Sequence, residues 1–303
     1  MGLLSKIREK ELFLKYKDNI TGVLNVYKPK GLTSYDVVDR VQKILNTKAG
    51  HTGTLDPLAT GVLVVTLGKA TKLSELLTSS VKEYEASMIL GLETDTLDTE
   101  GEVLNEKKSL IDKDKIIDSL NSFKGIYNQE VPKYSAVKID GKKLYEYARE
   151  GIFVKLPKRD VQIFDIKLLD FYQKDDKTFV KFYVKVSKGT YIRSLIRDIA
   201  YSTGTIGVMS DLVRISQGNF KIESSYTLDD IENGNYKILE VKDLGLPFKM
   251  ADESLKKKIL NGVPIDGDED ILLFLDSDGN ELAIYKNQDG MLRMYKMLYQ
   301  TKH

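Results

Sequence analysis

The sequence contains no cysteine, no tryptophan and only two histidines in 303 residues. The lack of cysteine excludes disulfides, thiolate metal sites and thiol catalysis. One histidine is His51, and the other, His303, is the last residue of the chain. We therefore do not expect a histidine-based metal site, and a protein without a structural metal is the prediction.

Long apolar runs are also missing from the sequence. No window approaches the roughly 18 uninterrupted apolar residues of a membrane span. The first ten residues lack the apolar segment of a secretion signal. The apolar and charged fractions, 42% and 30%, are typical of globular proteins. We expect a cytoplasmic protein without membrane contact, and the length predicts about two domains.

The formal net charge of +1 conceals an uneven distribution. Residues 221–303 carry 11 basic and 16 acidic side chains, a balance of −5, which leaves +6 on residues 1–220. A basic part of a chain is typical of proteins that bind nucleic acid. An ordinary solvated surface also accommodates such a charge, so the distribution alone leaves both interpretations open.

The most informative segment is the glycine-rich stretch Gly50–Gly61, which leads directly into an apolar run. Asp56 precedes a proline, and this position disfavours helical backbone. We therefore expect Asp56 on a stiff, extended corner. A carboxylate on a rigid loop beside a buried strand suits nucleophilic or acid–base chemistry. The alternative is a structured turn in which Asp56 only caps a neighbouring group.

Hydrophobic periodicity predicts an α+β fold with a mixed, largely antiparallel sheet flanked by helices, because strands and helices alternate without a regular βαβ period. Residues 82–90 alternate as a strand that places Tyr84 on its inward face. Thr33 and Asp36 form a capping box before a predicted helix. A further helix is predicted over residues 70–77. From about residue 242, short alternating runs separated by turns predict a small β-rich second domain.

Residues 132–149 combine basic and aromatic side chains around an Asp-Gly turn. Basic side chains neutralise phosphates, and aromatic rings accept unstacked bases at about 1–3 kcal/mol each. The segment is therefore a candidate RNA-binding surface. A hairpin and an amphipathic helix with ordinary surface lysines are the alternative. The side chains concerned are Lys133, Tyr134, Lys138, Lys142, Lys143, Tyr145, Tyr147 and Arg149.

Taken together, residues 20–220 resemble the TruB family of tRNA pseudouridine synthases. The resemblance implies a catalytic domain over residues 1–240, with an RNA-binding insert near 103–160. It also implies a PUA-like RNA-binding domain over residues 241–303. The motifs that carry the resemblance are Lys28–Ser34, Gly50–Gly61, Lys82–Tyr84, Leu90–Gly101, Tyr134–Glu146, Ser187–Arg193 and Asp211–Leu212.

The resemblance implies isomerisation of the uridine at position 55 in the TΨC loop of tRNA. The base would be detached, turned and rejoined to the ribose through carbon, without a metal or a cofactor. Asp56 matches the catalytic aspartate, which would attack either ribose C1′ or the uracil ring. Arg193 matches the arginine that pairs with it, in a charge-assisted contact. Its place in the first turn of a predicted helix also favours an anionic partner.

Further roles follow from the resemblance alone. Tyr84 would be a catalytic residue that stacks on the flipped uracil and could relay a proton from the sugar. Tyr191 and Leu212 would wall the pocket. His51 would fill the space that the flipped base leaves, which lowers the cost of unstacking. Arg214 would contact the RNA, although the family usually has two arginines after the leucine and this sequence has Val213 and Arg214.

The implied partner is tRNA, bound through its TΨC arm, and the protein is expected to be a monomer with no obligatory protein partner. We also expect RNA binding that weakens steeply with salt. Three alternatives stay open. The chain would then be a tRNA-binding or folding factor without catalysis, a relative that depends on guide RNA, or a synthase that modifies another RNA.

Overall fold

The computed structural model describes residues 20–78 and 80–299. The first ten residues, in which no secretion signal was expected, and His303, which was not expected to bind a metal, lie outside the described residues. The described residues contain no helix that is long and apolar enough to cross a membrane.

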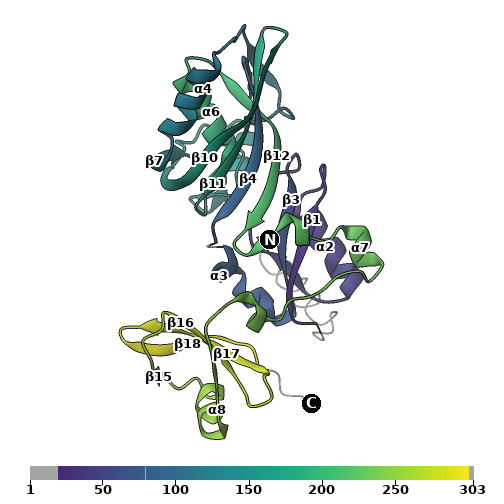
Figure 1. The fold of residues 1–303 in the computed structure, drawn as a ribbon, viewed down its shortest axis with the longest axis vertical. Helices are drawn as coiled ribbons and strands as arrows, with labels where there is room; N and C mark the ends of the chain where they lie inside the picture. Colours follow the sequence, from purple (N-terminus) through teal and green to yellow (C-terminus); the bar gives the residue numbers. More distant parts are fainter. Residues whose placement is uncertain (1–19, 79, 300–303) are drawn as a thin grey trace.

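A large mixed sheet forms the centre of the molecule (Figure 1). Strands β12 and β3 pair in parallel, and the other neighbours along the main path are antiparallel. Helices flank this sheet, so the predicted α+β class with a largely antiparallel sheet is confirmed. The strand order is β1 (Gly22–Lys28), β3 (Thr60–Leu67), β12 (Gly207–Gln217), β4 (Lys82–Leu90), β11 (Lys177–Val186), β10 (Lys158–Lys174) and β7 (Gly125–Glu130).

Strands β4 and β11 alternate strictly between buried and half-buried positions, as a period of two requires. The predicted inward face of β4, which includes Tyr84, is confirmed. Helices α4 (Lys113–Ser122) and α6 (Ile192–Ser202) lie against this part of the sheet (Figure 1). Their apolar side chains join those of β4 and β11 in one core cluster.

A second cluster packs helix α2 (Ser34–Leu45) and helix α7 (Leu228–Glu232) against β1 and β3. The predicted capping box is present at the start of α2. Thr33 N donates to Asp36 Oδ2 at 2.8 Å, and Asp36 N donates to Thr33 Oγ1 at 3.1 Å. The predicted helix over residues 70–77 is divided into a 3-10 segment, η1 (Gly68–Leu73), and a short helix, α3 (Ser74–Thr78).

The C-terminal part forms a separate five-stranded sheet with helix α8 (Glu253–Leu260) beside it (Figure 1). The predicted β-rich region after residue 242 is therefore present. Its apolar side chains share a core cluster with β1, β3 and η1. The strand order is β14 (Phe248–Met250), β16 (Ile271–Leu275), β17 (Glu281–Gln288), β18 (Met291–Met297) and β15 (Ile265–Asp266).

Shorter elements complete the described chain. They include the 92–106 hairpin and the hairpin and helix of the basic–aromatic segment. Their bounds are β2 (Ala49–His51), β5 (Leu92–Thr94), β6 (Val103–Glu106), β8 (Lys138–Ile139), β9 (Lys142–Lys143), α5 (Leu144–Arg149), β13 (Phe220–Lys221), η2 (Ile222–Ser224) and η3 (Val241–Leu244).

The short parallel contact between β3 and β12 fixes the end of the Gly50–Gly61 segment. Thr60 lies opposite Val213, and Gly61 lies opposite Arg214. Gly61 has φ +98°, and a Cβ at this position would lie 2.3 Å from the carbonyl oxygen of Arg214. Glycine is therefore needed both for the backbone conformation and for the close approach of β12.

We expect Gly61→Ala to destabilise the protein more than Gly141→Ala. Both glycines have positive φ, but a Cβ at Gly141 meets nothing within 4 Å. Gly141→Ala should therefore cost only the backbone strain, about 1–2 kcal/mol. Gly61→Ala should cost about 1–3 kcal/mol more from overpacking. Urea unfolding measures both free energies, and equal losses would contradict the close-approach argument.

Candidate active site

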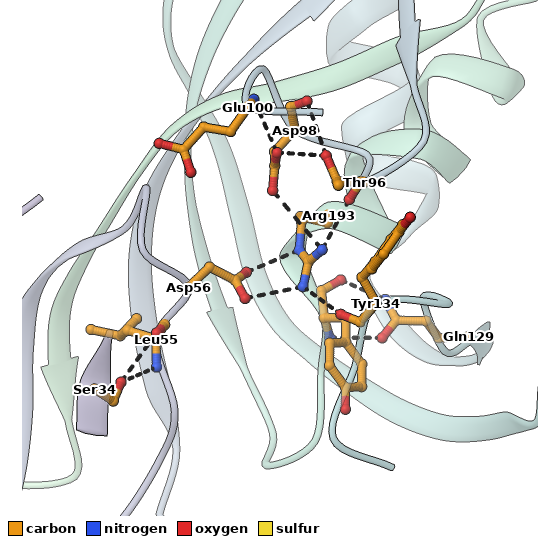
Figure 2. Close-up of polar contacts among 10 residues, drawn as sticks. Ser34, Leu55, Asp56, Thr96, Asp98, Glu100, Gln129, Tyr134 and Arg193 are labelled. Carbon is orange, nitrogen blue, oxygen red and sulfur yellow. Dashed lines mark hydrogen bonds and ion pairs between the residues drawn. The ribbon is translucent and has the colours of Figure 1, made fainter. Parts of the chain in front are cut away.

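The loop around Asp56 is anchored from behind by side chains of β1 and α2. Ser34 Oγ donates to Leu55 O at 3.1 Å and accepts from Leu55 N at 2.8 Å (Figure 2). Lys28 Nζ, which is fully buried, donates to Pro57 O at 3.2 Å and to Ala59 O at 2.6 Å. These bonds hold the main chain on both sides of Asp56, whose side chain stays one-third exposed.

Asp56 forms a two-pronged ion pair with Arg193 of α6 (Figure 2). Arg193 Nε lies 2.9 Å from Asp56 Oδ2, and Arg193 Nη2 lies 3.0 Å from Asp56 Oδ1. The Arg193 side chain is only 7% exposed. Two parallel charge-assisted bonds fix the orientation of a carboxylate as well as its charge. The pairing predicted from the sequence is therefore present.

The remaining donors of Arg193 bind two other segments. Nη1 donates to Thr96 O at 2.9 Å, and Nη2 donates to Tyr134 O at 3.1 Å. A second carboxylate, Asp98, lies 3.9 Å from Nη1. Asp98 is itself held by Thr96 Oγ1 at 2.7 Å and by the main-chain N of Glu100 at 3.1 Å. The guanidinium thus joins the Asp56 loop, the 91–101 loop, the basic–aromatic segment and α6 (Figure 2).

The start of α6 is fixed by a buried glutamine of β7. Gln129 Oε1 accepts from Tyr191 N at 2.8 Å, and Gln129 Nε2 donates to Tyr191 O at 3.0 Å. Helix α6 begins at the next residue, Ile192, and Arg193 lies in its first turn as expected. These two hydrogen bonds position the backbone of Tyr191 and thereby the first turn of α6, which carries Arg193.

A cavity of about 450 Å³ opens above the ion pair. Its lining includes five of the predicted catalytic and substrate-binding residues, which lie far apart in the sequence, and two of the predicted RNA-binding residues, Tyr134 and Arg214. Tyr84 and Leu212 are 6% and 4% exposed, so each presents only a small area to this cavity. The structure brings these residues together, and their individual roles stay predictions. The five are Asp56, Tyr84, Tyr191, Arg193 and Leu212.

His51 lies at the end of β2 and is not among the residues that line the cavity. Its Nδ1 accepts a hydrogen bond from Gly53 N at 3.4 Å. Burial, together with the positive charge of Arg214, lowers the pKa of His51, so the imidazole is neutral at pH 7. That His51 fills the space left in the RNA by the flipped base stays a prediction.

Arg214 is 1% exposed and binds main-chain carbonyls. Its Nε donates to Val62 O at 2.6 Å, and its Nη2 donates to Gly53 O at 2.9 Å. Arg214 therefore connects the two ends of the loop that carries Asp56. It lines the cavity, and two of its three nitrogens, Nε and Nη2, are engaged in this anchoring. The predicted contact of Arg214 with RNA stays a prediction.

The basic–aromatic segment places cations against tyrosine rings. Lys133 Nζ lies 5.1 Å from the centre of the Tyr134 ring. Lys143 Nζ and the guanidinium carbon of Arg149 each lie 5.4 Å from the centre of the Tyr145 ring. Such contacts hold aromatic and cationic groups on one surface, as RNA recognition requires.

Two other predicted RNA-binding lysines lie in the hairpin. Lys142 pairs with Glu150 and lies 4.8 Å from the centre of the Tyr147 ring. Lys138 is exposed.

Sequence reasoning missed Lys82, whose Nζ donates to Thr78 O at 2.9 Å and to Ser80 O at 3.0 Å. Burial, followed by the charges of Arg214 and Lys188, lowers the pKa of Lys82 to about 8. The alternation of residues 82–90 places Lys82 on the same inward face as Tyr84, so the sequence pattern indicated that Lys82 is buried.

Ser135 was also missed. It lines the cavity, and its Oγ is buried without a hydrogen-bond partner among the described residues. The described part of the chain contains no group of three or more His, Asp or Glu residues that could hold a metal ion.

Comparison with known proteins identifies the family. A model described as "TruB family pseudouridylate synthase (N terminal domain)" matches residues 42–192. A protein of Clostridium kluyveri named "tRNA pseudouridine synthase B" is 40% identical over 289 residues, covering 91% of this chain and 99% of its own length. A Staphylococcus aureus protein of the same name is 44% identical, with coverages of 87% and 93%. The chain belongs to the TruB family.

The family and the class of enzyme predicted from the sequence, a pseudouridine synthase, are thereby confirmed. Solved structures agree with this fold. One described as "Structure of H/ACA RNP bound to a substrate RNA containing 2'-deoxyuridine" matches with a TM-score of 0.68 and 26% identity, over 92% of this chain and 85% of that chain. The TruB-family chain thus has the pseudouridine synthase fold, with a strand-rich C-terminal part of the PUA-like kind.

The lowered pKa of Lys82 predicts a pH dependence of stability. The pKa is about 8 in the folded enzyme, against 10.5 for a free lysine. Between these values the unfolded chain binds more protons, so the free energy of unfolding should rise with pH. Denaturant unfolding between pH 8 and about 9.5, below the ionisation of exposed tyrosines, measures this rise.

Lys82→Met should reduce the rise. Part of the rise in the free energy of unfolding should remain, because burial also lowers the pKa of Lys28 to about 8. Lys30→Met, at an exposed position, is the control and should keep the wild-type slope. A slope unchanged by Lys82→Met would contradict the assignment.

Proposed function

We propose that this enzyme converts the uridine at position 55 in the TΨC loop of tRNA to pseudouridine, with Asp56 as the nucleophile. The observation that carries the proposal is the two-pronged contact between Asp56 and Arg193 at the floor of a cavity. The contact fixes the orientation of a carboxylate that lines the cavity a nucleotide would enter. The tRNA substrate is supported by the names of relatives that are 40–44% identical.

The reaction is an isomerisation in which no atom is gained or lost overall. The bond between N1 of uracil and C1′ of ribose breaks, and a bond between C5 and C1′ forms. The proton on C5 is lost, and N1 gains a proton. Asp56 attacks either C1′ or the uracil ring and is released when the new bond is complete. Because the change is redox-neutral, we propose that the enzyme needs neither a metal nor a cofactor.

The nucleotide must leave the RNA stack to reach Asp56, at a cost of a few kcal/mol. Tyr84 is proposed to stack on the flipped uracil, between the walls that Tyr191 and Leu212 provide. His51 is proposed to occupy the space left in the RNA, where its neutral ring can stack on a base.

The surface of residues 133–149 is proposed to contact the TΨC arm. Its exposed cations Lys133, Lys138 and Arg149 supply charge, and its half-buried tyrosines supply rings for stacking. The hydrogen bond from Arg193 to Tyr134 O connects this surface to the active site. We propose residues 1–240 as the catalytic domain, with residues 103–160 as its RNA-binding insert. Residues 241–303 form the PUA-like domain, whose surplus of acidic residues favours a modest electrostatic role.

Two other functions compete with this proposal, beside the third alternative of a synthase that modifies another RNA. A tRNA-binding or folding factor would need the surface but not the ion pair. A guide-RNA-dependent synthase is suggested by the match to an H/ACA RNP structure, at 26% identity. The relatives of higher identity favour a stand-alone tRNA enzyme. We therefore propose a cytoplasmic monomer, active without a protein partner on an isolated TΨC stem-loop.

Asp56→Asn tests the proposal. The substitution keeps the shape of the side chain but removes its charge, so pseudouridine formation in the stem-loop should be abolished. RNA affinity should stay within about tenfold, a loss of at most about 1.4 kcal/mol. The measurements are chemical mapping of pseudouridine and equilibrium binding of the same RNA.

Asp39→Asn is the matched control, because Asp39 lies on the surface of α2 and pairs only with Lys43 among the ion pairs of the described chain. It should retain wild-type activity. Binding without product formation by the wild-type chain would favour a folding factor. Product that appears only with added guide RNA and proteins would favour the guide-dependent alternative.

A further inference from the structure

A second, open cavity of about 620 Å³ adjoins the catalytic cavity. Thr78, Lys188 and Gly189 line both cavities, so the two are continuous at the rim of the active site. The second cavity also receives side chains from the basic–aromatic hairpin and from the start of β10. Its lining contains the four cationic residues Lys138, Lys158, Arg159 and Lys188, and no acidic residue of the described chain.

These four cations are not paired with carboxylates. None of them forms an ion pair with another residue within the described ranges, 20–78 and 80–299. Neighbouring lysines of the same sheet behave differently, because Lys181 lies 2.6 Å from Glu85 and Lys167 lies 2.6 Å from Asp165. Lys158 interacts only at longer range with Asp198. Four positive charges without an ion-pair partner around one cavity raise the local potential and attract an anion.

Arg159 lines the second cavity and contacts a residue of the first. Its guanidinium carbon lies 5.5 Å from the centre of the Tyr191 ring, which lines the catalytic cavity. Gly189, at φ +82°, leaves room for this arrangement, since a Cβ there would lie 3.2 Å from Arg159 Nη1. The guanidinium of half-buried Arg159 is therefore held against Tyr191, while Lys158 and Lys188, which line the same cavity, are exposed.

We propose that the second cavity binds the phosphodiester backbone of the substrate RNA immediately beside the flipped nucleotide. This inference rests on the proposed function. When the base and ribose enter the catalytic cavity, the phosphates attached to that ribose must lie at its rim. The cationic groups at the rim are those of the second cavity, and guanidinium and ammonium groups are the usual ligands of RNA phosphates.

The first test is the salt dependence of binding to a TΨC stem-loop. The double variant Lys158→Gln/Lys188→Gln should bind more weakly than wild type, with a slope of log K against log salt reduced by about 0.7–0.9 per lost phosphate contact. The control Lys108→Gln/Lys174→Gln removes two exposed lysines that pair with acidic residues. It should keep the wild-type slope, and an equal effect of both pairs would overturn the inference.

The second test removes the charge from the RNA instead. Stem-loops with one neutral methylphosphonate are prepared at each phosphate within two nucleotides of the target uridine. At one position or more, the substitution should weaken binding to wild type at least threefold but leave binding to the Lys158→Gln/Lys188→Gln variant unchanged. The two changes would then act on the same contact. Equal sensitivity of the two proteins at every position would overturn the inference.

The failure of this inference is distinguishable from failure of the proposed function. Product formation on the unmodified stem-loop by wild-type enzyme, with no change in slope for the double variant, rejects only the phosphate site. Absence of product with wild-type enzyme rejects the proposed function, and the binding measurements still decide whether these lysines contact phosphate. Circular dichroism of both double variants verifies that the exposed substitutions leave the fold intact.

Discussion

The ion pair between Arg193 and Asp56 is the interaction on which the rest of the site depends. The guanidinium also binds the carbonyls of Thr96 and Tyr134 and lies close to Asp98. Four segments are thereby joined at one buried side chain. Because unpairing a buried charge costs about 3–5 kcal/mol, the segments that form the cavity walls are coupled to this ion pair. The same contact organises the fold locally and orients the carboxylate.

The loop that carries Asp56 is held by side chains of β1, α2 and β12. Lys28, Ser34 and Arg214 all bind main-chain atoms of this loop or its ends, so the Asp56 side chain is free to face the cavity. Preorganisation of this kind fixes the position of a nucleophile before the substrate arrives. The basic residues near the site are of two kinds, those that bind the loop and those that are exposed to solvent. Buried Arg214 anchors backbone, whereas the exposed cations at the rim are available to RNA.

The α+β class, the inward face of β4 and the capping box at Thr33 were predictable from the sequence, because each depends on local spacing. The resemblance also indicated Arg193 as the partner of Asp56. The burial of Arg214 was not predicted, since it depends on carbonyls that Gly53 and Val62 supply from distant parts of the sequence. The burial of Lys82 was missed although its carbonyl partners, Thr78 and Ser80, are local. Asp98 was quoted only as part of a motif, and its approach to Arg193 depends on the path of the 91–101 loop. Helix α3 was misjudged in extent because residues 68–73 form a 3-10 segment.

Arg193→Lys tests the central claim most directly, because lysine keeps the positive charge but cannot form the two-pronged contact with Asp56. The measurement is the single-turnover rate of pseudouridine formation at saturating enzyme. Loss of one charge-assisted bond, worth about 1.5–3 kcal/mol, predicts a rate about 10- to 100-fold lower, with RNA affinity retained. A wild-type rate in the folded variant would contradict the account.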